Sequence, residues 1–237
     1  MPRNEFKIGD IVTLKSHPLA FQPNGEMDVY INQIPPFMCV KEVHIERNKK
    51  LYSQEASKAQ IADDVKYLCT YFNQHRMEFE DRFVYQEMLL PLDKITFHKE
   101  EEKGEGHITL VQETIGYPMA TYEYGKRVFF RTFKLERRKK FKKFVKTAAA
   151  ASGATPSATS SKGSNSHFTH TSPAFILDGI KPNDTKNIYN TKTGKLQRET
   201  SDELYKVLWY NAYQEKFSEE FLPKEFFVDD VKIYFGK

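Results

Sequence analysis

Basic side chains gather in one segment of this 237-residue chain, between residues 126 and 146. The segment holds eleven Lys and Arg residues against a single acid, Glu136, so it carries +10 while the whole chain carries +4. Such a density of positive charge attracts the phosphates of nucleic acid, an anionic membrane surface or an acidic protein. The eleven residues are Lys126, Arg127, Arg131, Lys134, Arg137, Arg138, Lys139, Lys140, Lys142, Lys143 and Lys146.

A helix is one conformation that would organise this basic segment. On a helix, Phe133, Phe141 and Phe144 share one side, and Lys and Arg side chains cover most of the remainder. This arrangement suits a phosphate backbone or an anionic membrane surface. The alternative is a solvated helix that packs by its Phe residues on a neighbouring domain.

Two aromatic residues form a second kind of candidate site. Phe72 and Tyr210 fall on the outward face of the strands in which they are expected. Small barrels use such aromatics to hold peptides or nucleic-acid bases. The alternative is that both side chains complete a contact between domains or a second layer of core.

Motifs of the common catalytic and metal sites are missing from the sequence. It has no Gly-rich phosphate loop, no Gly-x-Ser-x-Gly, no His-Glu-x-x-His and no Cys-x-x-Cys. His167 and His170 have a spacing that suits a metal, but no further ligand is near them in the sequence. We therefore expect a protein without enzymatic activity, cofactor or metal, unless separate loops assemble a site.

The two cysteines and the hydropathy pattern bear on the cellular compartment. Cys39 and Cys69 each lie within an apolar, strand-like run, which predicts buried free thiols. Residues 1–10 are polar rather than a signal peptide, and no apolar run reaches the roughly 18 residues of a membrane span. These features predict a cytoplasmic protein with no transmembrane segment.

The elements that must hold these residues occur twice along the chain. At an offset of 138, residues 64–99 align with residues 202–237 without a gap, and ten of the 36 pairs are identical. Composition alone would give roughly two or three identities. The alignment continues upstream with a slip of one residue, and more weakly to Gly9 and Gly125.

Each copy is expected to form five short strands. The third strand alternates clearly, so one set of its side chains should point into a core. The expected first, second and last strands cover residues 10–15, 37–43 and 94–98 in the first copy, and 126–131, 174–180 and 232–236 in the second. The inward residues of the third strands are Val65, Tyr67, Cys69 and Tyr71, and Tyr205, Val207 and Trp209.

Short strands and a core rich in Phe and Tyr predict a mainly β fold with two small SH3-like barrels in tandem. The start of the first copy, from Phe6 to Ser16 (FKIGDIVTLKS), and the later block from Cys69 to Asn73 (CTYFN) resemble the YodC-like family of small uncharacterised bacterial proteins. The resemblance covers about 90 residues, with a long loop between Ser16 and Pro36. It implies an SH3-like barrel without known catalysis.

The domain organisation follows from the repeat and the sequence between its copies. We expect one barrel over residues 1–99, a charged turn, hairpin and basic segment over 100–146, a disordered Ala/Ser/Thr-rich tether over 147–171, and a second barrel over 172–237. Residues 126–146 belong either to the first domain or to the second barrel, whose first strand they would then supply.

Two functional hypotheses follow. The first is a binding protein that contacts nucleic acid, or an acidic protein surface, through its basic segment. The second is a protein–protein scaffold or assembly component with no nucleic-acid role.

Overall fold

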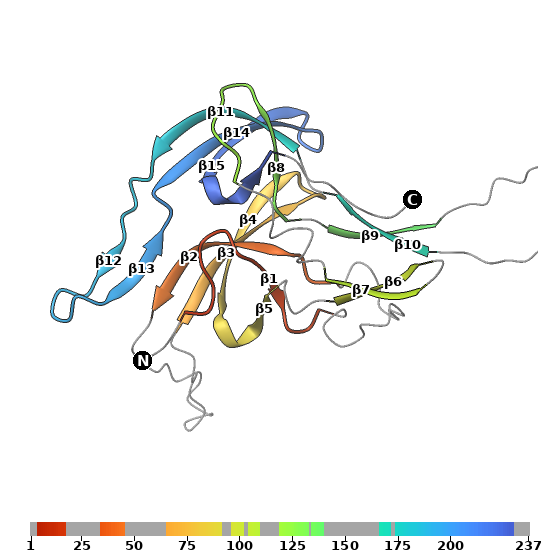
Figure 1. The fold of residues 1–237 in the computed structure, drawn as a ribbon. Coiled ribbons are helices and arrows are strands. Elements are labelled where there is room, and N and C mark those ends of the chain that lie inside the picture. Colours follow the sequence, from red (N-terminus) through yellow and green to blue (C-terminus); the bar gives the residue numbers. More distant parts are fainter. Residues whose placement is uncertain are drawn as a thin grey trace, which may run out of the picture.

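The computed structural model is mainly β, and the only helices in its described part are three-residue 3-10 turns. It describes residues 4–17, 34–45, 65–91, 96–101, 104–109, 119–132, 134–139, 166–171 and 174–229. The strands form two large antiparallel sheets and two two-stranded ribbons, and the two sheets lie one above the other in Figure 1.

The lower sheet comes from the N-terminal half of the chain and is called module 1 here. Its own strands are ordered β4-β3-β2-β1-β5. They are β1 (Ile11–Leu14), β2 (Met38–Ile45), β3 (Val65–Asn73), β4 (Glu78–Tyr85) and β5 (Leu89–Pro91), and η3 (Gln86–Met88) precedes β5. The alternation of β3 is confirmed, because Val65, Tyr67 and Cys69 are buried.

The upper sheet, module 2, repeats this order as β15-β14-β11-β8-β16. Its strands are β8 (Arg127–Phe130), β11 (Ala174–Pro182), β14 (Glu203–Asn211), β15 (Lys216–Pro223) and β16 (Phe227–Val228), and η5 (Lys224–Phe226) precedes β16. β8 pairs with β11 and β16, so this basic strand lies in the sheet of module 2. Tyr205, Val207 and Trp209 point into the core.

The two modules also agree in backbone detail at the offsets seen in the sequence. Gly9 and Gly125 both have positive φ, and their amides donate to Val40 O and Leu177 O, respectively, at 2.9 and 2.8 Å. Met77 and its counterpart Glu215 adopt φ of 55° and 52°. β2 and β11 are each irregular one residue beyond Val40 and Leu177. Residue equivalences between the modules can therefore be assigned individually.

The described part shows no closed barrel and places one expected strand in a different pairing. Each large sheet is open, because no strand pairing in the described part joins β4 to β5 or β15 to β16. The expected last strand of the first copy overlaps β6 (Thr96–Glu101), which pairs with β7 (Gly104–Thr109) as a separate ribbon. A strand can satisfy its backbone hydrogen bonds with either neighbour, and local sequence does not select between them. The corresponding residues 232–236 lie outside the described part.

The basic segment and the expected tether also differ from the prediction. Lys134–Lys139 forms a strand, β9, rather than a helix, and it pairs with β10 (Ser166–Thr171). β10 contains Phe and Thr, which favour strands, and a short helix without packing is marginal. The last six residues of the expected tether are thus part of a ribbon, and residues 147–165 lie outside the described part.

A hairpin of module 2 completes the sheet of module 1. β12 (Ile188–Tyr189) pairs with β13 (Leu196–Thr200), and β13 pairs with β2 through residues 198–200 and 42–44. Figure 1 shows this hairpin descending from the upper sheet to lie beside β2. The two modules therefore share a hydrogen-bonded sheet.

The hydrophobic core follows the same division. One cluster lies within module 1 and includes Val12, Val40 and Tyr67. The other belongs mainly to module 2 but also takes up Ile11, Phe37 and Cys39 from the opposite face of the module 1 sheet. The sheet of module 1 thus contributes buried residues from both faces, and the face that includes Ile11 and Cys39 packs against module 2.

Candidate binding surfaces

An aromatic contact joins the two modules. Phe72 of β3 and Phe79 of β4 lie edge to face, with ring centroids 4.9 Å apart. Both rings pack into an aromatic pocket of module 2. The Phe72 centroid lies 5.3 Å from that of Phe175. The Phe79 centroid lies 5.2 Å from that of Phe130 and 5.5 Å from that of Trp209. Each pair of this geometry stabilises the contact by about 0.5–1.5 kcal/mol beyond burial. Phe72, predicted as a surface aromatic, thus takes part in a contact between the modules.

Hydrogen bonds fix the position of this aromatic contact. Trp209 Nε1 donates to Met77 O at 2.8 Å, and Asn211 Nδ2 donates to Arg76 O and Met77 O at 3.0 and 3.1 Å. The acceptors belong to the turn between β3 and β4, where Met77 has its positive φ. The turn of module 1 is therefore held against the end of β14.

A glycine allows the backbones to approach at the other end of the contact. A Cβ added to Gly9 would lie 2.7 Å from Glu225 Cβ, which is closer than real Cβ contacts. Arg131 Nη1 donates to Gly9 O at 3.4 Å and to Glu225 O at 3.3 Å. Arg131 is one of the eleven basic residues, and the structure uses it to join the modules.

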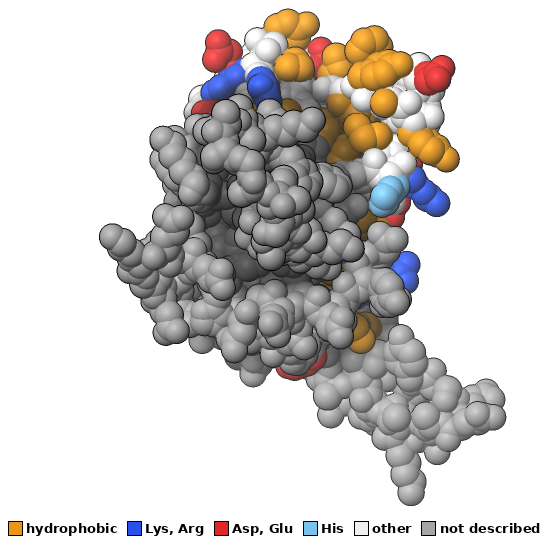
Figure 2. All heavy atoms as spheres, turned by 90° about the vertical axis from the view of Figure 1, so that its right-hand side faces the viewer, with side chains coloured by type: hydrophobic (Ala, Val, Ile, Leu, Met, Phe, Trp, Pro, Cys, Tyr) orange, Lys and Arg blue, Asp and Glu red, His pale blue; other side chains and the backbone are white. Residues whose placement is uncertain are grey.

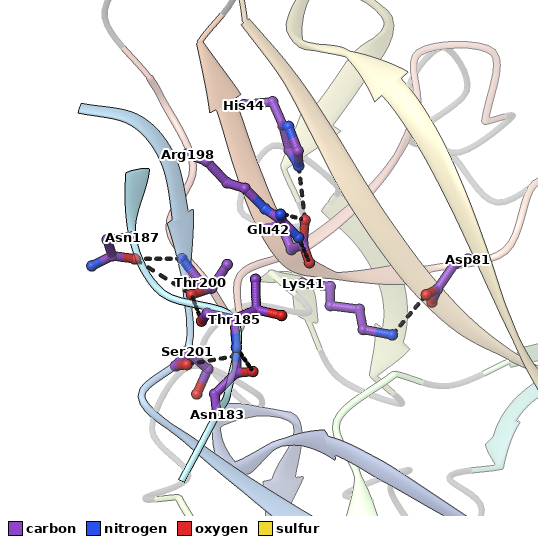
Figure 3. Close-up of polar contacts among 10 residues, drawn as sticks. All are labelled: Lys41, Glu42, His44, Asp81, Asn183, Thr185, Asn187, Arg198, Thr200 and Ser201. Atoms are coloured by element: carbon purple, nitrogen blue, oxygen red, sulfur yellow. Dashed lines mark hydrogen bonds and ion pairs between the residues drawn. The ribbon is translucent and has the colours of Figure 1, made fainter. Parts of the chain in front are cut away.

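Figure 3 shows a polar cluster that holds the β12–β13 hairpin on β2. Arg198 binds Glu42 through Nη2 and Nε, at 2.7 and 3.0 Å, and His44 Nε2 lies 2.8 Å from Glu42 Oε2. Burial opposes ionisation of Glu42, but the hydrogen bonds from His44 and Arg198 outweigh it and lower its pKa to about 2. Thr200 N donates to Asn187 Oδ1 at 2.8 Å and steadies the base of the hairpin.

A second carboxyl near the module contact behaves in the opposite way. Burial raises the pKa of Glu220 on β15 to about 7, and the charges of Asp81 and Glu78 add to this while Lys41 opposes it. Lys41 is held by Asp81, at 2.6 Å. Figure 3 shows this ion pair beside the hairpin cluster. The contact between the modules therefore contains a carboxyl that titrates near neutral pH.

Module 2 presents the counterparts of Phe72 and Phe79 to solvent. These are Tyr210 and Phe217, called the aromatic pair here, which lie edge to face with centroids 5.5 Å apart. They are 52% and 72% exposed, and the neighbouring Ile176 is also exposed. Figure 2 shows hydrophobic side chains gathered near the top of the molecule, at the height of β11, β14 and β15. Exposed aromatic clusters of this kind mark interaction surfaces.

Module 1 in turn has an open pocket where module 2 has a filled one. The module 1 pocket has a volume of about 310 Å³ and an apolar floor with a charged rim. It is lined by Leu14, Pro36, Met38, Tyr71, Glu80, Asp81, Arg82 and Val84. Tyr71 OH donates to Glu80 Oε2 at 2.5 Å, and burial followed by this hydrogen bond raises the Tyr71 pKa to about 12. Sequence reasoning could not find this pocket, because its lining comes from β1, from residues 36–38, and from β3 and β4.

The predicted basic residues are divided among different surroundings. Lys126 pairs with Asp229 at 2.8 Å, and Arg127 lies over the Phe129 ring at 4.7 Å. Lys134, Arg137, Arg138 and Lys139 lie in β9, opposite a strand with no acidic residue. Lys140, Lys142, Lys143 and Lys146 lie outside the described part of the chain.

The remaining candidates bear on redox, metal and membrane chemistry. Cys39 and Cys69 are buried and free, as predicted, and burial raises the pKa of both thiols. Among the described residues, no cluster of three or more His, Cys, Asp or Glu side chains is placed to bind a metal ion. Within the same residues, no helix has the length and apolar character needed to traverse a bilayer. His167 and His170 lie in β10.

No protein-family profile, curated protein or solved structure matches this chain. The likeness to the YodC-like family stays a prediction from the residues quoted above.

Proposed function

We propose that this chain is a non-enzymatic assembly or scaffold protein made of two SH3-like modules. Its binding surfaces are the aromatic pair of module 2 and the pocket of module 1. The open five-stranded order of both modules is compatible with strongly bent, SH3-like sheets. The expected cytoplasmic location belongs to the same proposal.

The observation that carries this proposal is the exposure of Tyr210 and Phe217. Two adjoining aromatic rings on the outer face of a sheet cost solvation free energy, and a protein partner that covers them recovers it. Aromatic residues also dominate the binding free energy of protein interfaces. Protein binding therefore fits this exposed pair of rings.

Affinity capture with the purified chain tests this function. We expect wild-type protein to retain a protein in stoichiometric amount, and the complex to re-form from pure components. Phe217→Ser should weaken that complex by about tenfold or more, as expected for an aromatic hot spot. Tyr189→Ser removes an exposed aromatic residue of β12 and is the matched control. A partner that binds wild type and Phe217→Ser equally would contradict the proposal.

Nucleic-acid binding through the β9–β10 ribbon is the second candidate function. β9 contains four basic residues and one acid, and β10 contains no acid, so the ribbon carries an excess of positive charge. A two-stranded ribbon fits the major groove of DNA. If this function is correct, DNA or RNA is retained at low salt and released at high salt. Replacing Arg137, Arg138 and Lys139 by Gln should abolish retention, and unchanged retention would exclude the ribbon.

A further inference from the structure

We propose that the protein which covers the aromatic pair is a second copy of this chain. Tyr210 and Phe217 of one copy enter the module 1 pocket of the next, so the copies associate head to tail. This inference rests on the proposed function and names its partner. The contact between copies repeats the contact that already joins module 1 to module 2 within each chain.

The aromatic pair corresponds to the residues that form the internal contact. Phe72 and Phe79 of module 1 are related to Tyr210 and Phe217 of module 2 by the offset of 138. Both pairs lie at the ends of the same two strands and meet edge to face. The first pair is covered by the other module, whereas the second is exposed. The internal contact thus shows what chemistry covers this surface.

The open pocket corresponds to the pocket that is filled. Leu14, Met38 and Tyr71 of module 1 are the counterparts of Phe130, Phe175 and Trp209, which surround the rings of Phe72 and Phe79. The residues of module 1 are smaller in each case, and a volume of about 310 Å³ is open among them. A pocket of this size and apolar floor accommodates an aromatic side chain.

The close backbone contact that Gly9 allows can also form at its counterpart in module 2. Gly9 meets Glu225 of module 2 at close range. Its counterpart Gly125 has the same positive φ but no heavy atom within 4 Å of an added Cβ. Glu87, the counterpart of Glu225, has an exposed side chain. In the proposed contact, Gly125 of one copy meets Glu87 of the next.

The charges around the two surfaces are complementary. Internally, Glu220 lies near Lys41 and Asp81. The counterparts in the proposed contact are Arg82 on the pocket rim and the carboxylates Asp178 and Glu219 near the aromatic pair.

These two carboxylates flank Lys206, at 2.9 and 2.7 Å. The rim carboxylate Glu80 has the opposite charge to Lys216, which precedes Phe217 in β15. Opposite charges across an interface set register and partner choice.

The association is heterologous, since the pocket and the aromatic pair belong to different modules. A dimer formed in this way leaves one pocket and one aromatic pair free. Further copies then add until a ring closes or an open filament forms.

Sedimentation velocity over a wide concentration range tests the inference. We expect wild type to form dimers and larger species as concentration rises. Phe217→Ser disrupts the aromatic pair, so the protein concentration needed for association should rise about tenfold or more. Tyr189→Ser should behave as wild type. Two further variants alter the pocket instead: Leu14→Trp fills it, and Arg82→Glu reverses an exposed charge on its rim. Circular dichroism checks that each variant is folded.

A mixing experiment separates head-to-tail association from other modes. Phe217→Ser keeps an intact pocket, and Leu14→Trp or Arg82→Glu keeps an intact aromatic pair. At a concentration where wild type begins to associate, each variant should be monomeric alone, and an equimolar mixture should give a 1:1 dimer that grows no further. Self-association of Leu14→Trp or Arg82→Glu alone would overturn the inference, because the intact aromatic pairs would then bind each other. A mixture that stays monomeric while wild type associates would overturn it as well.

Wild type that stays monomeric at all concentrations also overturns the inference. In that case, capture of a different protein that depends on Phe217 leaves the proposed function standing. If neither self-association nor such capture is found, both proposals fail.

Discussion

Glu220 makes the contact between the modules sensitive to pH. Its pKa of about 7 in the folded protein lies above the ordinary value of 4.5, chiefly because of burial. A carboxyl whose pKa rises on folding binds its proton more tightly in the folded state. Its contribution to stability is therefore fully present below about pH 4.5 and is lost as pH rises to about 7.

We predict that Glu220→Gln removes this pH dependence. The free energy of unfolding of wild type, relative to the variant, should fall between pH 4.5 and 7, and then level off. Urea titrations at several pH values measure the difference. Glu123→Gln, at an exposed position, is the matched control and should leave the pH profile unchanged. A parallel pH profile for wild type and Glu220→Gln would show that Glu220 ionises normally.

At the scale of elements, an ion pair helps to hold the β12–β13 hairpin on β2. Glu42 is held by two hydrogen bonds from Arg198, and its side chain is only 13% exposed. Removing the cation leaves a carboxylate with little access to water, which costs more than the loss of a surface pair.

We predict that Arg198→Met destabilises the protein by about 1–3 kcal/mol and loosens β13. In this variant, amide hydrogen exchange should speed up, relative to wild type, more in residues 198–200 than in β14. Lys15→Met is the control, because Lys15 pairs with the exposed Glu87 and such pairs contribute less than about 1 kcal/mol. Equal effects of the two substitutions would refute this role for Arg198.

The elements also show where sequence reasoning works and where it stops. The inward faces of β3 and β14 could be read from the alternation of Tyr67 and Cys69, or of Tyr205 and Val207, because local pattern determines which residues share a face. The same pattern cannot say what covers the outward face. Phe72 and Tyr210 occupy equivalent positions, yet module 2 covers the first and leaves the second exposed.

Pairing between distant strands is the other limit. The bond between Arg198 and Glu42 spans 156 residues, and nothing near either residue specifies the partner. The strand β9 illustrates the same point, because its conformation depends on β10. The module 1 pocket could not be predicted either, since Leu14, Met38 and Tyr71 meet only when the sheet bends.

At the scale of the whole molecule, the modules share a core and should unfold together. The only tryptophan in the chain, Trp209, donates its indole N–H to Met77 O of module 1. Its fluorescence therefore reports on the contact between the modules. Phe72 and Phe79 lose their cover if either module unfolds.

We predict a single unfolding transition in urea, with coincident curves from Trp209 fluorescence and circular dichroism. Val43 lies in the core cluster of module 1, which does not include Trp209. Val43→Ala should lower the free energy of unfolding by about 2 kcal/mol and shift both midpoints equally. Two resolved transitions, with the fluorescence midpoint unchanged by Val43→Ala, would show that the modules are independent.

The pairing of β13 with β2 has a consequence for synthesis on the ribosome. β2 is complete when residue 45 has been made, but its neighbour β13 is not available until residue 200 has emerged. At about 5–20 residues per second, the edge of β2 from Glu42 to His44 waits for roughly 8–30 s without this partner. An unpaired strand edge is prone to aggregation. This chain therefore most needs a chaperone while β2 has been synthesised and β13 has not.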